Sequence, residues 1–123
     1  MTKKCTVLVV EDEPLIRMDL VERLQGYGCD TLEAGSALEA ITILQQRTDV
    51  TVVFTDIQMP GTMDGIQLAK YVRKRWPPTI IIVSSGKVVP APDALAEGIP
   101  FLTKPYDEAT LCSVIDDVKA RLA

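Results

Sequence analysis

Residues 52–60 read Val-Val-Phe-Thr-Asp-Ile-Gln-Met-Pro. The first four are apolar or β-prone, which predicts a buried strand. Asp56 follows where that strand should end, and Pro60-Gly61 turns the chain away. Burial of an isolated carboxylate is unfavourable by several kcal/mol unless another group compensates it. In an open parallel sheet, ligands bind at the edge formed by the carboxyl ends of the strands. The rest of the chain should therefore supply a partner for Asp56.

Length and composition predict one folded domain. With 123 residues, the chain is long enough for one hydrophobic core and too short for two domains. A hydrophobic content of 47% and a charged content of 24% are typical of globular proteins. The net charge of −4 argues against a nucleic-acid-binding surface. We expect a single domain over residues 1–123 without an output domain.

Cysteine usage and hydropathy predict the compartment. The three cysteines lie far apart in the sequence, and the chain has no histidine. Neither a disulfide framework nor the ligand spacing of a zinc site is present. No apolar stretch has the length of a membrane span, and the N-terminus lacks a signal-type apolar core. These features predict a soluble, cytoplasmic protein that contacts no membrane and no nucleic acid directly.

Predicted strands alternate with predicted helices along the chain. Apolar, β-prone runs predict strands at residues 5–10, 29–34, 50–55, 79–83 and 99–103. Helical periodicity and capping residues predict helices over residues 14–26, 36–47, 65–76, 93–97 and from Asp107 onward. This alternation predicts an α/β sandwich with a parallel sheet and right-handed crossovers. Pro90 and Pro92 predict that the fourth helix is short and begins late.

Two helices carry more specific predictions. In the first, the apolar residues that recur at helical spacing are Leu15, Ile16, Leu20 and Leu24. The second should begin at Ser36, with Glu39 in the position that completes a capping box.

Polar residues follow four of the predicted strands. Glu11 and Asp12 follow the first strand, Asp56 the third, Ser84 the fourth and Lys104 the fifth. Because parallel strands end at one edge of the sheet, these side chains should lie close together. Three neighbouring carboxylates repel one another and raise their pKa values, so they require a cation. Mg²⁺ suits such oxygen ligands, and the sequence therefore predicts a magnesium site.

The same set of groups predicts phosphoryl chemistry. A carboxylate such as Asp56 can act as a nucleophile and form an acyl phosphate. A metal ion, the Lys104 ammonium and a hydroxyl group would stabilise charge on the transferring oxygens.

The chain resembles a bacterial two-component response regulator receiver domain over essentially its whole length. The resemblance is carried by residues 9–14 (Val-Val-Glu-Asp-Glu-Pro), 56–60, 63–65 (Met-Asp-Gly), 84–86 (Ser-Ser-Gly) and 104–106 (Lys-Pro-Tyr). It implies a doubly wound (βα)5, flavodoxin-like fold with strand order 2-1-3-4-5, of the stand-alone, chemotaxis-regulator-like kind. This chain has two residues, Gly61 and Thr62, where the common family pattern has one.

The resemblance also implies roles for the acidic residues. Asp56 would accept a phosphoryl group from the phosphohistidine of a sensor histidine kinase or of a histidine phosphotransfer protein. Asp12 would bind Mg²⁺ directly, Glu11 would act near it through water, and the backbone carbonyl of Gln58 would complete the protein ligands. Such a protein is a signalling switch that promotes its own phosphorylation and dephosphorylation, and it is not an enzyme acting on an external metabolite.

Further roles implied by the resemblance concern the last two strands. Lys104 would contact the phosphoryl oxygens, and its bond to Pro105 would be cis. Ser84 would move to hydrogen-bond the phosphoryl group, and Phe101 would turn inward as the aromatic switch. The change would shift a population between two packings and alter the face that binds a downstream protein, whose identity is unknown.

Alternatives remain from the residues alone. Ser84 or Ser85 can each be a simple turn former, Phe101 an ordinary core residue and Glu13 a solvated acid. A phosphorylation-independent interaction module with the same fold is opposed by the presence of both Asp56 and Lys104. A flavin-binding protein is opposed by the acidic segment 11–14, which would repel a phosphate.

Overall fold

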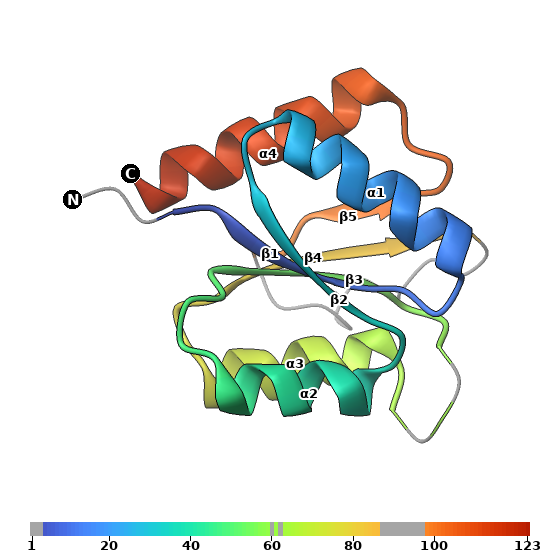
Figure 1. Cartoon of the computed structure of the whole chain (residues 1–123), viewed down its shortest axis with the longest axis vertical. Coiled ribbons are helices and arrows are strands. Elements are labelled where there is room, and N and C mark those ends of the chain that lie inside the picture. The colour runs from blue at the N-terminus through green and yellow to red at the C-terminus, as the bar shows by residue number, and fades with distance from the viewer. Residues whose placement is uncertain (1–3, 60, 62, 87–97) are drawn as a thin grey trace.

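The computed structural model describes residues 4–59, 61, 63–86 and 98–123. Five parallel strands form one sheet in the order β2-β1-β3-β4-β5 (Figure 1). The strands are β1 (Thr6–Val10), β2 (Asp30–Ala34), β3 (Val52–Asp56), β4 (Ile80–Ser85) and β5 (Phe101–Thr103). The helices of the described residues are α1 (Pro14–Gly26), α2 (Ala37–Gln46), α3 (Gly65–Arg75) and α4 (Glu108–Leu122). The predicted fold class and strand order are confirmed.

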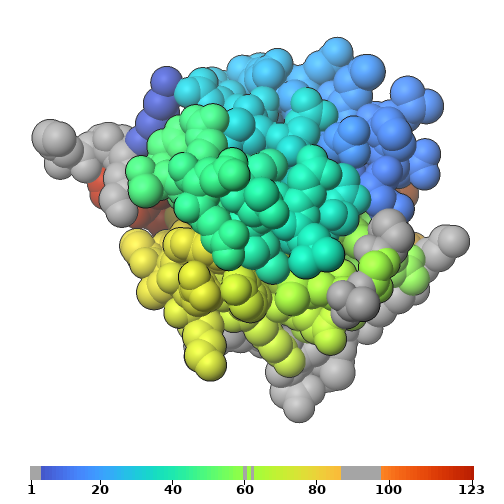
Figure 2. Space-filling view, turned by 60° about the horizontal axis from the view of Figure 1, so that its bottom comes forward, coloured from blue at the N-terminus to red at the C-terminus, as the bar shows by residue number. Residues whose placement is uncertain are grey.

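Helices cover both faces of the sheet, because alternate strand residues point to opposite sides. One core contains Val7, Val9 and Phe54, packed against α1 and α4. The other core contains Leu8 and Val53, packed against α2 and α3. Figure 1 shows these two layers, and Figure 2 looks onto the face where α2 and α3 lie side by side. The central strands are buried on both sides, as their continuous apolar sequences predict.

Capping side chains fix the helix starts. Ser36 accepts a hydrogen bond from the Glu39 amide as predicted, but the Glu39 carboxylate accepts from the Gly35 amide instead of closing the box. A complete capping box is formed instead by Asp64 and Gln67 at the start of α3.

The predicted helix α1 is confirmed, but only part of its apolar periodicity faces the core. Leu15 and Ile16 are 75% and 41% exposed, whereas the helix buries Leu20, Val21 and Leu24. All the buried residues of α1 lie in its second half, so its first turns add no side chain to the core. Periodicity alone does not show where a helix passes the edge of a sheet.

Two strands extend further at their carboxyl ends than predicted. β3 includes Asp56, and β4 includes Ser84 and Ser85. The predicted helix over residues 93–97, together with Pro90 and Pro92, lies outside the described residues. The C-terminal helix, α4, is therefore the one that the sequence predicts as the fifth. No helix in the described ranges combines the length and the apolar character that crossing a membrane requires.

Candidate functional site

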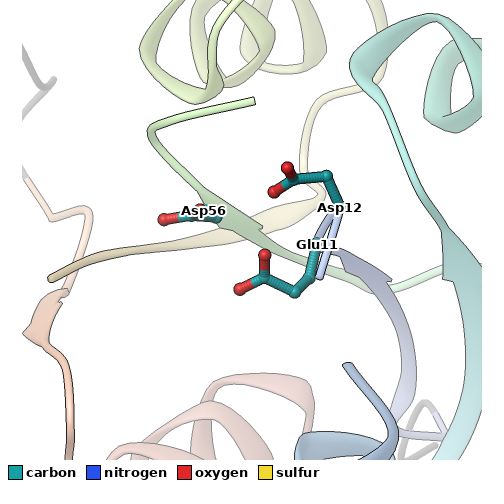
Figure 3. A group of neighbouring side chains, drawn as sticks. All are labelled: Glu11, Asp12 and Asp56. Atoms are coloured by element: carbon teal, nitrogen blue, oxygen red, sulfur yellow. The ribbon is translucent and has the colours of Figure 1, made fainter. Parts of the chain in front are cut away.

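An acidic cluster lies at the edge of the sheet formed by the carboxyl ends of the strands, called here the carboxyl edge. Glu11 and Asp12 follow β1, and Asp56 is the last residue of β3. One carboxylate oxygen from each lies within 4.8 Å of the other two, and Figure 3 shows the three side chains reaching to the same side. Glu11 and Asp56 are only 4% and 8% exposed, whereas Asp12 is open to solvent. The predicted meeting of these three residues is confirmed.

Lys104 brings a positive charge to this cluster. Its ammonium group donates a hydrogen bond to Glu11 Oε1 and lies 3.5 Å from Asp56 Oδ1. The backbone holds it there, because the Lys104 amide donates to the Ser85 carbonyl at 2.9 Å. The Lys104-Pro105 bond is cis, as expected. Among the described residues, one ammonium thus pairs with two of the three carboxylates, those of Glu11 and Asp56.

Burial dominates the electrostatics of the two inner carboxyl groups. It raises the pKa of Asp56, and the nearby Lys104 charge opposes this shift without cancelling it. It also raises the pKa of Glu11 against the hydrogen bonds from Lys104 and the Glu13 amide. A divalent cation bound by these oxygens would stabilise their charged forms. The site is therefore short of positive charge.

The start of α3 packs directly against the backbone of Asp56. A Cβ atom on Gly65 would lie 1.9 Å from the Asp56 carbonyl oxygen, so only glycine fits without displacement. The Gly65 amide donates to the Ile57 carbonyl at 2.8 Å, and the Ile57 amide donates to the Ser84 carbonyl at 2.9 Å. Gly65 belongs to the sequence pattern quoted above, but its reason is visible only in three dimensions.

Arg17 is a supporting residue that sequence reasoning missed. Its Nη1 donates to the Glu11 carbonyl at 2.8 Å, and its Nε donates to Glu33 Oε1 of β2 at 3.1 Å. It thereby fixes the loop that carries the acidic pair. Nothing in the sequence marks it, since its partners come from separate strands.

The sheet register distinguishes the two serines of β4. Ser84 pairs with Asp56, and both are two residues beyond side chains of the core that packs on α1 and α4 (Ile82 and Phe54). Because side chains alternate along strands, Ser84 lies on the same face as Asp56, and Ser85 on the other. The Ser84 position therefore fits the predicted role better. Both residues are buried.

Gln58 and Phe101 are the remaining predicted site residues, and Tyr106 and Gly61 belong to the quoted family motifs or adjoin them. Gln58 is exposed and follows Asp56 by two positions. Phe101 pairs with Val83 and packs, partly buried, against the core of α2 and α3. Tyr106 packs beside Phe54, with ring centroids 6.0 Å apart. Gly61 has a φ of +103°, a conformation that favours glycine, in the segment where the chain exceeds the family pattern.

Comparisons with known proteins agree with this geometry. The model of the response regulator receiver domain matches residues 7–116. The sensor kinase CckA of Brucella abortus is 37% identical over 120 residues, which cover 92% of this chain and 12% of that protein. The transcriptional regulatory protein GlrR of Escherichia coli K12 is 36% identical over 118 residues, covering 94% of this chain and 26% of that protein. The chain thus spans 12% and 26% of the length of these two relatives.

Solved structures are similar over nearly the whole chain. A response regulator receiver protein from Pseudomonas putida has a TM-score of 0.84 and 29% identity, covering 95% of this chain and 99% of that one. The response regulator TrrA from Thermotoga maritima, solved with Mg(2+)-BeF, has a TM-score of 0.81 and 27% identity, covering 93% and 98%. Fold, acidic cluster and sequence similarity coincide, and the chain belongs to the response regulator receiver domain family.

Proposed function

We propose that this chain is a Mg²⁺-dependent phosphoacceptor switch of a two-component or phosphorelay system. Asp56 accepts a phosphoryl group from the phosphohistidine of a sensor histidine kinase or a histidine phosphotransfer protein. The observation that carries this proposal is the buried Asp56 carboxylate, held 3.5 Å from the Lys104 ammonium and within 4.8 Å of two further carboxylates.

The donor set fits Mg²⁺. Glu11, Asp12 and Asp56 offer hard oxygen ligands, and exposed Asp12 leaves one side open for the waters that Mg²⁺ retains. Gln58, two residues beyond Asp56, would add its backbone carbonyl. The similar TrrA structure contains Mg(2+)-BeF. When bound, the ion would neutralise charge on the carboxylates and on the phosphoryl oxygens.

Phosphoryl transfer uses the chain's own residues in defined roles. An oxygen of Asp56 attacks phosphorus, the P–N bond to the donor histidine breaks, and an acyl phosphate forms on Asp56. The Lys104 ammonium stabilises charge on the phosphoryl oxygens. Water later attacks the same phosphorus and releases inorganic phosphate. The chain promotes both steps on itself and turns over no external metabolite.

The signal leaves the site through β4 and β5. The Ser84 hydroxyl lies on the Asp56 face of the sheet and donates a hydrogen bond to the phosphoryl group. Once Ser84 has moved, Phe101, two strands from Asp56, turns inward as the aromatic switch. Phosphorylation thereby shifts a population between two packings and changes the face offered to a downstream protein.

The exposed apolar residues of α1 suit a protein donor. Leu15 and Met18 are 75% and 53% exposed and lie one turn apart in the first half of α1, the helix that follows Asp12 in the chain. Large apolar side chains exposed beside a reactive site indicate a surface that another protein covers. The donor histidine would approach Asp56 across this turn.

Intact-mass spectrometry tests the proposal. Incubation with acetyl phosphate and Mg²⁺ should add one phosphoryl group (about 80 Da) to the wild-type chain. The addition should disappear with EDTA and in Asp56→Asn. The matched control, Asp49→Asn, removes an exposed aspartate paired with Arg47 and should label like wild type. Unchanged labelling of Asp56→Asn would refute the assignment, and an unlabelled wild-type chain would favour the phosphorylation-independent interaction module.

A further inference from the structure

A pair of buried thiols lies at the opposite edge of the sheet, formed by the amino ends of the strands and called here the amino edge. Cys5 and Cys29 are 24 residues apart in the sequence, yet their Sγ atoms lie 2.8 Å apart and share a hydrogen bond. Both are buried, at 7% and 4% exposure, and neither forms a disulfide in this structure. The proposed phosphoacceptor site does not use them.

The backbone places the two residues in suitable positions for a covalent bond. Cys5 directly precedes β1, Cys29 directly precedes β2, and the first residues of these parallel strands, Thr6 and Asp30, are partners in register. The Asp30 amide donates to the Cys5 carbonyl at 2.9 Å. Neighbouring strands lie about 4.7–4.9 Å apart, within the range of about 4.4–6.8 Å that separates the Cα atoms of disulfides. Closing the bond moves the sulfurs by less than about 1 Å, to about 2.05 Å.

The surroundings favour a thiolate on one of the two sulfurs. The hydrogen bond shared with Cys5, followed by the positive charge of Lys119, lowers the pKa of Cys29 against the effect of burial. The same hydrogen bond, together with burial, raises the pKa of Cys5. Lys119 is held close by, because its ammonium donates to the Tyr27 carbonyl. Redox-sensor cysteines often combine a low-pKa sulfur with a second, resolving sulfur nearby.

A small molecule can approach Cys29 of this pair. Cys29 lines a hollow of about 600 Å³ together with Gly28 and Asp30. Gly28, with a φ of +85°, keeps the loop before Cys29 free of a side chain. The hollow opens on the amino edge and not on the acidic cluster.

We propose that Cys5 and Cys29 form an oxidation-sensitive pair, which a peroxide converts into an intramolecular disulfide between the starts of β1 and β2. The Cys29 thiolate attacks one peroxide oxygen, the O–O bond breaks, and Cys29 becomes a sulfenic acid as hydroxide leaves. The Cys5 sulfur then attacks the Cys29 sulfur, and the S–O bond breaks. With the protons of the two thiols, one hydrogen peroxide yields two waters. A thiol reductant reduces the disulfide and restores both thiols.

The wild-type chain provides a test that needs no variant. After treatment with hydrogen peroxide, the chain is denatured without reductant and alkylated. Untreated protein has three alkylation sites, one for each free cysteine. Treated protein should have lost the two sites at Cys5 and Cys29, and a non-reducing peptide map should join the peptides that contain them. Dithiothreitol should restore both sites.

Variants separate this chemistry from general oxidation. In Cys112→Ser, which removes the third, partly exposed cysteine, peroxide should lower the mass by two hydrogens (about 2 Da). In Cys5→Ser/Cys112→Ser, Cys29 has no resolving partner and should instead gain oxygen, in steps of about 16 Da. The proposal is overturned if Cys29 gains oxygen in Cys112→Ser without a cross-link. It is equally overturned if the pair stays reduced under conditions that oxidise Cys112 in the wild-type chain.

The outcome is independent of the phosphoacceptor proposal. The thiol pair lies at the amino edge, and Asp56 ends β3 at the carboxyl edge. Either reaction can therefore fail without the other.

Discussion

The two edges of the sheet differ in the burial and the balance of their charged side chains. At the amino edge, Lys4 pairs with Asp30 at 2.8 Å and Arg47 with Asp49 at 2.6 Å, one cation to one anion, in solvent. At the carboxyl edge, Glu11 and Asp56 are buried and share one ammonium with Asp12 nearby. Because the ion pairs at the amino edge are balanced and exposed to solvent, they contribute little to the stability of the fold. Burial and an excess of negative charge favour the binding of a cation by the second set, which is the basis of the proposed phosphoacceptor site.

The close packing behind Asp56 should give the largest effect. Gly65→Ala places a methyl group against the Asp56 carbonyl and should lower the free energy of unfolding by about 3 kcal/mol. Gly26→Ala is the matched control, since a Cβ there meets no atom within 4 Å and the variant should be neutral or slightly stabilising. Urea denaturation measures both, and equal stability of the two variants would contradict the packing argument.

Removing an acid at the carboxyl edge should weaken metal binding. Asp12→Asn removes the carboxylate that we propose as a direct Mg²⁺ ligand, and Mg²⁺ affinity should fall by about 100-fold or more, beyond the usual loss for an outer-shell partner. Isothermal titration calorimetry measures this. Trp76 fluorescence is less suitable, because Trp76 follows the end of α3 that is remote from the site. Asp49→Asn at the amino edge should bind like wild type, and a similar loss in both variants would mean that binding reports net charge alone.

The Lys104 ammonium should compete with a metal ion for the same oxygens. In Lys104→Met, Mg²⁺ affinity should rise by roughly tenfold, because a positive charge 3.5 Å from Asp56 is removed. Phosphorylation by acetyl phosphate should nevertheless slow down, since the phosphoryl oxygens lose a cationic partner. Calorimetry and intact-mass time courses measure the two effects. A loss of both affinity and rate would show that Lys104 supports the site only structurally.

Buried charge should make stability depend on pH. Burial raises the pKa of Asp56 in the folded chain above its unfolded value, so the folded state holds this proton more tightly. Its contribution to the free energy of unfolding therefore falls as pH rises from the unfolded pKa through the raised folded pKa. Without Mg²⁺, Asp56→Asn should be about 1 kcal/mol more stable than wild type at pH 7.

The difference between Asp56→Asn and wild type should shrink as pH is lowered through that window, because wild-type Asp56 then becomes neutral. Urea denaturation at a series of pH values without metal measures it. A constant difference across pH would show that the carboxylate is not destabilised by burial.

The smallest effect is expected at the amino edge. Lys4→Gln breaks the exposed pair with Asp30 and should leave the urea midpoint unchanged at physiological salt. A clear destabilisation would remove the contrast between the two edges.

Much of this contrast could be predicted from the sequence. Apolar runs such as residues 52–54 and 80–82 specify buried parallel strands, and a polar residue at a strand end specifies the edge where it lies. Because Glu11, Asp56 and Lys104 follow strands of one predicted parallel sheet, their position at the same edge follows from the sequence. A site built from residues at strand ends can therefore be predicted from a single sequence.

Contacts between separate elements could not be predicted in this way. The approach of Gly65 to Asp56, the Arg17 bridge and the meeting of Cys5 with Cys29 depend on how loops and helix ends settle on the sheet. The exposure of Leu15 and Ile16 has the same origin, since it depends on how far α1 extends past β1. The signal for the cysteines was present, because each directly precedes one of two strands that the expected strand order places side by side, but the approach of the two sulfur atoms is visible only in the structure.

The most direct test of the central claim is to locate the phosphoryl group. The chain is treated with acetyl phosphate and Mg²⁺, the acyl phosphate is reduced with borohydride, and the peptides are sequenced by mass spectrometry. We predict that residue 56 alone is converted, to homoserine, and that EDTA abolishes the conversion. Conversion at Glu11 or Asp12, or equal conversion of residue 56 with and without the metal, would contradict the account.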